Sequence, residues 1–190
     1  MPQTREVVVE PLDRDGFQPF GQIIGELATP PIFQTPSAEV WQMDFSSQGA
    51  VEVMFVRYRK EAYEFATIER HYDIAQTFFP MGNSPSIMVV APPDNENRSK
   101  IPEPDAVRAF FVDGKTGIVL WPGTWHALTR FPVREDGGEF AMITGRDTQR
   151  DLEREKKDGT PAKLTQVVDY VKSFGVTFTL VDPNGLLRSS

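Results

Sequence analysis

The sequence predicts a mainly β protein, folded as an antiparallel sandwich or barrel with a few short helices. Sixteen Pro and fourteen Gly are spread along 190 residues and divide the chain into short segments. Residues 51–59 alternate as a half-buried strand does, with Val51, Val53 and Phe55 on one face. A hydrophobic content of 39% over this length is enough for one compact domain with its own core.

The first third of the chain predicts strands around one short helix. A strand is expected at 6–10. A helix is expected within 12–20, because Asp13 can cap it and the spacing of Phe17 and Phe20 puts both on one face. The remaining predictions here are strands at 21–25, 40–45 (weak) and 51–59, and a loop rich in Pro and Thr at 28–38.

The central part predicts closely spaced strands joined by turns. Strands are expected at 67–72, 75–80 and 86–91, the last of them buried, followed by a polar, Pro-rich loop at 92–104. Two hairpins are predicted from their turn residues, Asp113-Gly114 between strands 107–112 and 117–120, and Glu135 to Gly138 between strands 127–133 and 139–144.

The tail differs from the rest in composition. Residues 147–158 are highly charged and predict a solvated helix or a linker. A helix is expected over 160–174, since Thr160 can cap it, Pro161 suits its first turn and Gly175 can end it. Its apolar stripe would be Leu164, Val167, Val168 and Val171, and a last strand would follow at 176–181. We therefore expect a main domain over 1–150 and an extension over 151–190, packed on the same domain or at a dimer interface.

The composition excludes several classes of function. A net charge of −7 and a pI of about 4.9 disfavour binding to nucleic acid or to an anionic membrane. The absence of cysteine excludes disulfides, thiol nucleophiles and iron–sulfur clusters. The sequence has no apolar run of signal-peptide or transmembrane length, so a cytoplasmic location is expected.

The two histidines of the chain lie in segments that can share one metal ion. Glu69 and His71 are two apart on a predicted strand and therefore face the same way. His126 follows a Pro122-Gly123 turn that would direct it inward. With Gln76 they form a candidate set of oxygen and nitrogen ligands that suits nickel, manganese, iron or zinc better than calcium or magnesium. The alternative is that each histidine is an ordinary hydrogen-bonded core or surface residue.

These segments resemble known sequence motifs. Glu69-x-His71 with Gln76 and Gly82, and Gly117 to His126 with its Gly-x-x-His ending, are similar to the two cupin motifs. Residues 7–145 resemble the ureidoglycolate lyase family in the order of their motifs. Those motifs are Val9-Glu-Pro-Leu12, Phe17-x-Pro-Phe-Gly21, Glu69-Arg-His71, Gln76-Thr-Phe-Phe-Pro80, Ile87 to Ala91, Arg108-Ala-Phe110, Asp113-Gly114 and Thr124-Trp-His126.

The resemblance implies a fold, a cofactor and a reaction. The fold would be a cupin-type antiparallel β-barrel, also called a double-stranded β-helix, usually in a homodimer. The cofactor would be a divalent metal, for which nickel is often named. The reaction would be the splitting of ureidoglycolate, a small anionic carboxylate, into glyoxylate and urea during allantoin (purine nitrogen) catabolism.

On this hypothesis the predicted residues take specific roles. Glu69, His71, Gln76 and His126 would hold the metal, which would acidify the substrate hydroxyl. The catalytic residues would be Glu69, Arg70, His71 and His126, with Glu69 a candidate base. One of Arg57, Arg59 and Arg70 could clamp the carboxylate. Trp121 and Trp125 would wall the pocket and Gln42 would help to shape it.

The sequence also departs from the family pattern. Residues 33–42 lack the usual Asn-Asn-Gly turn and Arg-aromatic-His strand, and Ala127 replaces a second histidine. Residues 120–122 replace a Tyr-His-Arg, and the tail beyond about residue 150 shows no match. Two alternatives therefore stay open. One is a cupin enzyme acting on a less polar hydroxy- or keto-acid, and the other is a non-catalytic cupin that binds a small molecule or a partner.

Overall fold

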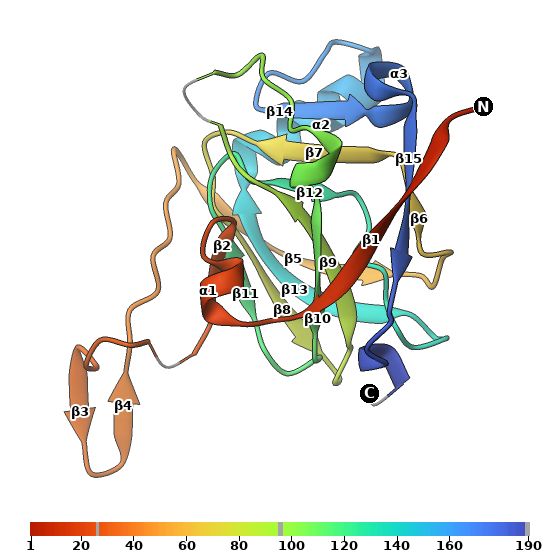
Figure 1. The fold of residues 1–190 in the computed structure, drawn as a ribbon. Coiled ribbons are helices and arrows are strands. Elements are labelled where there is room, and N and C mark those ends of the chain that lie inside the picture. Colours follow the sequence, from red (N-terminus) through yellow and green to blue (C-terminus); the bar gives the residue numbers. More distant parts are fainter. Residues whose placement is uncertain (26, 95–96, 189–190) are drawn as a thin grey trace.

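A computed structural model describes residues 1–25, 27–94 and 97–188. Its described part contains one strongly curled eight-stranded sheet, one five-stranded sheet and a small hairpin (Figure 1). In spatial order, the eight-stranded sheet contains β14 (Thr165–Asp169), β7 (Thr67–His71), β12 (Trp125–Ala127), β9 (Ser86–Ala91), β10 (Arg108–Val112), β1 (Gln3–Pro11), β15 (Val176–Val181) and β6 (Glu64–Phe65). The five-stranded sheet contains β2 (Gly21–Ile23), β11 (Ile118–Leu120), β8 (Gln76–Met81), β13 (Gly138–Gly145) and β5 (Val51–Tyr58). The fold is mainly β, as predicted.

Strand β9 shows how the core is divided. Its six residues are all buried, because apolar side chains cover both of its faces. Ile87, Val89 and Ala91 join one hydrophobic cluster with side chains of β1, β14 and β15. Met88 and Val90 join a second cluster with Phe78 and other side chains of the five-stranded sheet. The second cluster therefore lies between the two sheets, in the interior of the barrel.

Most predicted elements form close to their expected positions. Helix α1 (Arg14–Phe17) is capped by Asp13, whose Oδ1 accepts the N–H of Gly16 at 2.9 Å. Strand β15 spans the predicted 176–181, and α2 (Arg146–Asp158) shows that the charged segment is a helix. Strand β5 alternates as predicted, and its Glu52, Met54 and Val56 face is the less exposed one.

Several local predictions are wrong. The predicted hairpin at Asp113-Gly114 does not form, because β10 and β11 belong to different sheets. The strand expected at 127–133 ends at Ala127, the last residue of β12, so the second predicted hairpin does not form either, and β13 pairs with β5 and β8. The helix expected over 160–174 is instead β14 followed by α3 (Tyr170–Phe174), because Thr165–Asp169 pairs along the whole of β7. The loop expected at 28–38 instead contains the hairpin of β3 (Phe33–Thr35) and β4 (Ala38–Val40). The strand expected at 40–45 does not form, because β4 already ends at Val40.

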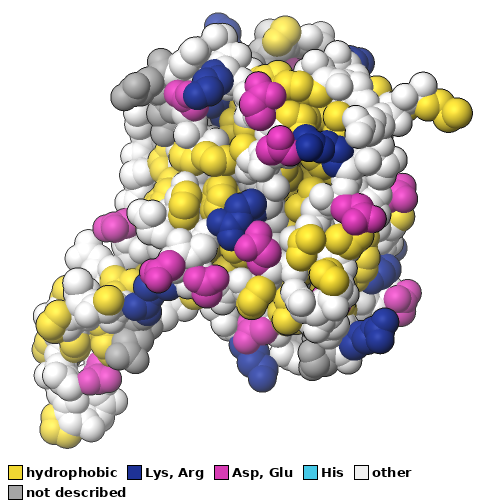
Figure 2. Space-filling view, in the orientation of Figure 1, with side chains coloured by type: hydrophobic (Ala, Val, Ile, Leu, Met, Phe, Trp, Pro, Cys, Tyr) yellow, Lys and Arg dark blue, Asp and Glu magenta, His cyan; other side chains and the backbone are white. Residues whose placement is uncertain are grey.

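The hairpin of β3 and β4 projects from the barrel as an arm (Figure 1). Ile32 and Phe33 are among the exposed apolar side chains of this arm, and the space-filling view shows such side chains on its surface (Figure 2). The predicted substrate-binding residue Gln42 is exposed two residues beyond β4. The arm thus removes Gln42 from the barrel interior of its own chain.

Residues beyond 150 belong to the same sheet as the candidate ligands. β14 pairs antiparallel with β7, so that Thr165 lies opposite His71 and Val167 opposite Glu69. β15 pairs in parallel with β1, from Gln3 opposite Val176 to Val8 opposite Val181. Two short helices complete the described fold, η1 (Pro104–Ala106) and η2 (Leu186–Arg188). Within the described residues, no helix has the length and apolar character needed to span a membrane.

Candidate metal centre

Glu69, His71 and His126 come together on the eight-stranded sheet. One potential ligand atom of each lies within 4.8 Å of the other two. The strand register explains the cluster: His126 is paired with Glu69 on one side and with Val90 on the other, and paired residues point to the same face. Since Val90 belongs to the cluster between the sheets, this face is the barrel interior. The structure therefore unites three of the four predicted ligands.

The hydrogen bonds of both imidazoles leave a nitrogen for a cation. His126 Nδ1 lies 3.1 Å from the carbonyl of Ala127, which can only accept, so Nδ1 carries the proton. Nδ1 is also 3.9 Å from Glu69 Oε1, whereas Nε2 of His126 is buried and has no hydrogen-bond partner among the described residues. His71 Nδ1 lies 2.8 Å from the hydroxyl of Thr165, and its Nε2 is 3.9 Å from Glu69 Oε1. A partner on one imidazole nitrogen and a lone pair on the other is typical of a metal-binding histidine.

Burial sets the charge of the cluster. It lowers the pKa of His71 to about 4, with a further contribution from the positive charge of Arg130, and it lowers the pKa of His126 well below its usual value. Both imidazoles are therefore neutral at pH 7 and can donate lone pairs. Burial also raises the pKa of Glu69, and Arg130 offsets part of that rise. Two neutral imidazoles and one carboxylate form a donor set suited to a divalent transition metal.

Gln76 faces the same interior from the other sheet. Its side chain is buried, and Nε2 donates to Thr144 Oγ1 at 3.3 Å. Its Oε1 has no partner, like Nε2 of His126. Buried polar atoms are normally hydrogen-bonded, so two unpartnered acceptors inside one barrel fit an arrangement that a cation completes. Gln76 stays a predicted fourth ligand.

Thr165 is the residue that orients His71, and the sequence had placed it in a helix. Replacing Thr165 with valine removes the hydroxyl at nearly constant volume, so we expect the affinity for nickel or manganese to fall by about 10- to 100-fold with the fold retained. Competition with a chelator would measure this change. Thr177→Val on β15 is the matched control, because among the described residues that hydroxyl contacts Thr4 alone, at 3.4 Å. Equal affinities for both variants would show that Thr165 does not orient the ligand.

Arg70 and Trp125 lie on the opposite face of the sheet from the cluster. Arg70 is fully buried and donates to the carbonyls of Asp94 and Arg98 and to Gln166. Its guanidinium also lies 4.5 Å from the ring centroid of Trp125. Both residues alternate with ligands along their strands, so the pleat directs them away from the interior. The structure gives them a packing role and does not bring them to the ligands.

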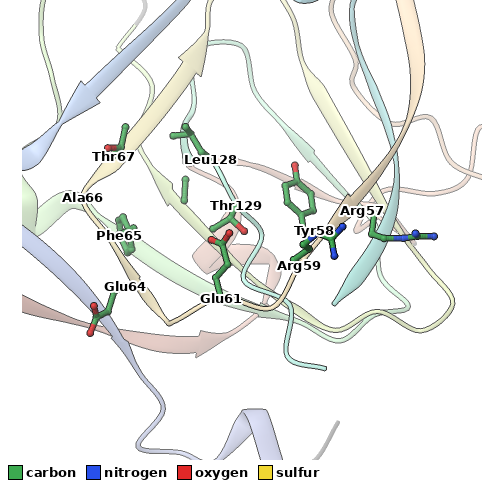
Figure 3. A pocket seen from close by; sticks show the side chains of 11 residues that line it. Arg57, Tyr58, Arg59, Glu61, Glu64, Phe65, Ala66, Thr67, Leu128 and Thr129 are labelled. Atoms are coloured by element: carbon green, nitrogen blue, oxygen red, sulfur yellow. The ribbon is translucent and has the colours of Figure 1, made fainter. Parts of the chain in front are cut away.

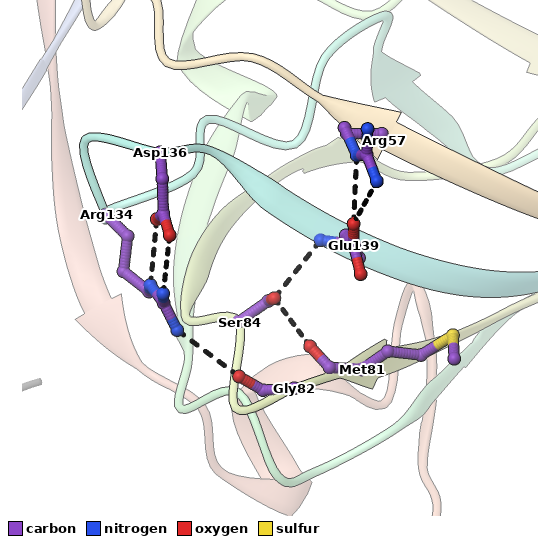
Figure 4. A network of polar contacts seen from close by, with 7 residues as sticks. All are labelled: Arg57, Met81, Gly82, Ser84, Arg134, Asp136 and Glu139. Atoms are coloured by element: carbon purple, nitrogen blue, oxygen red, sulfur yellow. Dashed lines mark hydrogen bonds and ion pairs between the residues drawn. The ribbon is translucent and has the colours of Figure 1, made fainter.

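The other predicted substrate residues are also held elsewhere. Arg57 forms an ion pair with Glu139 at 2.6 Å and belongs to a surface network of polar contacts (Figure 4). Trp121 donates from Nε1 to the carbonyl of Gln18 at 2.9 Å and packs beside α1. Arg57 and Arg59 both line a sizeable cavity. That cavity measures about 530 Å³, and it is bordered by Tyr58, Glu61, Leu128 and Thr129 among others but by none of the three clustered ligands (Figure 3).

Arg130 is the charged residue that the sequence analysis missed. It is 3% exposed, and Nη1 donates to the carbonyl of Ala127 at 2.6 Å. Its guanidinium packs over the ring of Phe78, 4.1 Å from the centroid, inside the barrel. No motif contains this position, and residues 127–133 had been assigned to an ordinary strand. Only the fold places this cation beside the cluster.

Comparison with known proteins identifies the family of the chain. The family model described as ureidoglycolate lyase matches residues 4–162. The chain belongs to the ureidoglycolate lyase family. It is 29% identical over 148 residues to the ureidoglycolate lyase of Azotobacter vinelandii, covering 73% of this chain and 84% of that protein. It is 32% identical over 146 residues to the ureidoglycolate lyase of Burkholderia mallei, covering 69% and 82%.

Membership in the ureidoglycolate lyase family confirms the resemblance seen in the sequence and the expectation of a lyase. The match ends at residue 162, before β14 begins. Thr165, which contacts His71, therefore lies outside the part of the chain that the family model covers.

Proposed function

We propose that this protein splits ureidoglycolate into glyoxylate and urea with the help of a divalent cation, as a step in allantoin breakdown. The observation that carries the proposal is the buried cluster of Glu69, His71 and His126, in which no described residue supplies a hydrogen-bond partner for His126 Nε2. The names of the relatives support the substrate. These three residues, with Gln76, would hold the cation, which when bound would supply Lewis-acid activation of the substrate hydroxyl.

The reaction needs one proton to move from oxygen to nitrogen. The substrate hydroxyl loses its proton and becomes the aldehyde of glyoxylate, while the carbon–nitrogen bond breaks and the released urea nitrogen gains a proton. Glu69 is the carboxylate at the cluster, and a carboxylate oxygen that it does not use for the cation can accept a proton. We therefore assign the proton transfer to Glu69.

The surroundings of the cluster exclude water and contain few charged groups. His71 and His126 are 4% and 2% exposed, so the reacting groups would meet in a largely dry interior. The neutral imidazoles add no positive charge, so the charged groups that act on one another at the cluster are the Glu69 carboxylate and the Arg130 guanidinium. Such a site suits a small anion that carries a hydroxyl group.

The direct test is release of glyoxylate and urea from racemic ureidoglycolate. We expect release well above the spontaneous rate with nickel- or manganese-loaded protein, and a loss of release after chelation. Equimolar urea and glyoxylate would exclude a hydrolysis that gives ammonia instead. Folded, cation-loaded protein that released neither product would contradict the proposed substrate, and less polar hydroxy- and keto-acids would be assayed next.

A further inference from the structure

Arg130 is a buried cation that forms no contact ion pair with a described carboxylate. Its guanidinium is charged at every physiological pH, and its residue is 3% exposed. Nη1 donates to the carbonyls of Ala127 and Thr129, and Nε has no partner. No carboxylate of the described residues forms an ion pair with it. Glu69 acts on Arg130 through space but forms no ion pair with it. Because a buried guanidinium with an unpartnered N–H is unfavourable, this position points to an anion that comes from solution.

The position of the guanidinium is fixed next to the ligands. The carbonyl of Ala127 accepts both His126 Nδ1–H, at 3.1 Å, and Arg130 Nη1–H, at 2.6 Å. The two side chains therefore donate to the same acceptor, the carbonyl oxygen of Ala127. The backbone carbonyl of Arg130 is held in turn by the N–H of Ile87 at 3.0 Å. Arg130 cannot move far from the cluster without breaking these contacts.

Aromatic rings shield the other side of the guanidinium. Its carbon lies 4.1 Å from the centroid of Phe78 and 5.6 Å from that of Tyr58. Tyr58 also borders the cavity of about 530 Å³. The rings hold the cation in an apolar setting, where a charge-assisted hydrogen bond is stronger than in water.

We propose that Arg130 is the residue of this chain that binds the substrate carboxylate, while Glu69, His71 and His126 act at the hydroxyl end. The proposal rests on the proposed function for the identity of the substrate. A planar guanidinium matches a carboxylate, and a 2-hydroxy acid has its two oxygen groups on neighbouring atoms, as the adjacent cation site and Arg130 require. None of the three arginines expected from the sequence is placed to do this.

A purely structural role is the rival explanation, since Arg130 also holds the carbonyls of Ala127 and Thr129. The two roles predict different effects on charged and uncharged ligands. A structural arginine would affect all ligands alike. A carboxylate-binding arginine would distinguish an acid from the uncharged amide of the same size.

The test compares the binding of glycolate and glycolamide to nickel-loaded protein by calorimetry, with nickel content measured for every variant. We expect wild-type protein to prefer glycolate at least tenfold. Arg130→Met should weaken glycolate about 10- to 100-fold and leave glycolamide unchanged, as loss of a charged hydrogen bond predicts. Arg130→Lys should retain part of the preference. Arg57→Met, which removes a surface arginine, is the matched control and should behave as wild type.

Two outcomes would overturn the proposal. One is a wild-type protein that does not prefer glycolate. The other is an unchanged preference in Arg130→Lys or Arg130→Met, and the lysine variant decides if the methionine variant does not fold. The measurement needs no turnover. A protein that binds glycolate through Arg130 but does not cleave ureidoglycolate would therefore refute the proposed function and leave this inference standing.

Discussion

Replacing His126 with alanine should abolish tight nickel or manganese binding and lower the rate of glyoxylate release more than about 100-fold. The physical reason is that His126 supplies a buried Nε2 with no other partner, and loss of a ligand costs more than the 10- to 100-fold typical of residues that only orient ligands. Metal analysis of the purified variant and the glyoxylate assay measure the two effects.

The neighbouring residue provides the control. Trp125→Phe alters an equally buried side chain of the same strand that points to the opposite face, so it should keep both the cation and the activity. If His126→Ala kept full turnover, or if Trp125→Phe lost as much as His126→Ala, the assignment of the centre would be wrong.

Ending the chain at residue 162, where the family match stops, should prevent the barrel from folding. The deletion removes β14 and β15 with five buried apolar side chains, Val168, Tyr170, Val176, Phe178 and Leu180. At roughly 1.5–3 kcal/mol each, their burial contributes about 10 kcal/mol, as much as the whole stability of a typical domain. Circular dichroism and thermal unfolding would detect the loss of cooperative structure.

A matched pair of substitutions tests the same point in the full-length protein. Val168→Asp puts a charge into the core and should mimic the truncation, whereas Val167 is 50% exposed, so Val167→Asp should change little. A truncated chain that unfolded cooperatively and still bound nickel would show that the barrel does not depend on these strands.

The sequence predicted the composition of the centre because its signals are local. Glu69 and His71 are two apart, and alternation alone puts them on one face. His126 could be assigned to the same set from its motif, although only the structure shows that it lies opposite Glu69 in the sheet. The predictions of Arg70 as a catalytic residue and of Trp125 as a pocket wall conflict with this alternation, since each lies one residue from a ligand and faces away from it.

The wrong predictions concern strand pairing, the choice between helix and strand, and burial, which local sequence does not determine. Asp113-Gly114 does make a turn, with Gly114 at φ +84° and Asp113 accepting two backbone N–H groups, but a turn does not determine which strands pair. Thr165–Asp169 fits an apolar helical stripe and a strand equally well, and pairing with β7 decides the outcome. Arg130 belongs to no motif, and its burial is a property of the assembled barrel.

The parallel pairing of β1 with β15 has a consequence for how the barrel is made. Partners such as Gln3 and Val176 are separated by almost the full length of the chain, so their contact is among the most non-local possible. During synthesis β1 emerges early and must wait, with one edge unpaired, until residues 176–181 have left the ribosome. The barrel should therefore close slowly and late, and newly made chains would depend on chaperones more than the finished protein does.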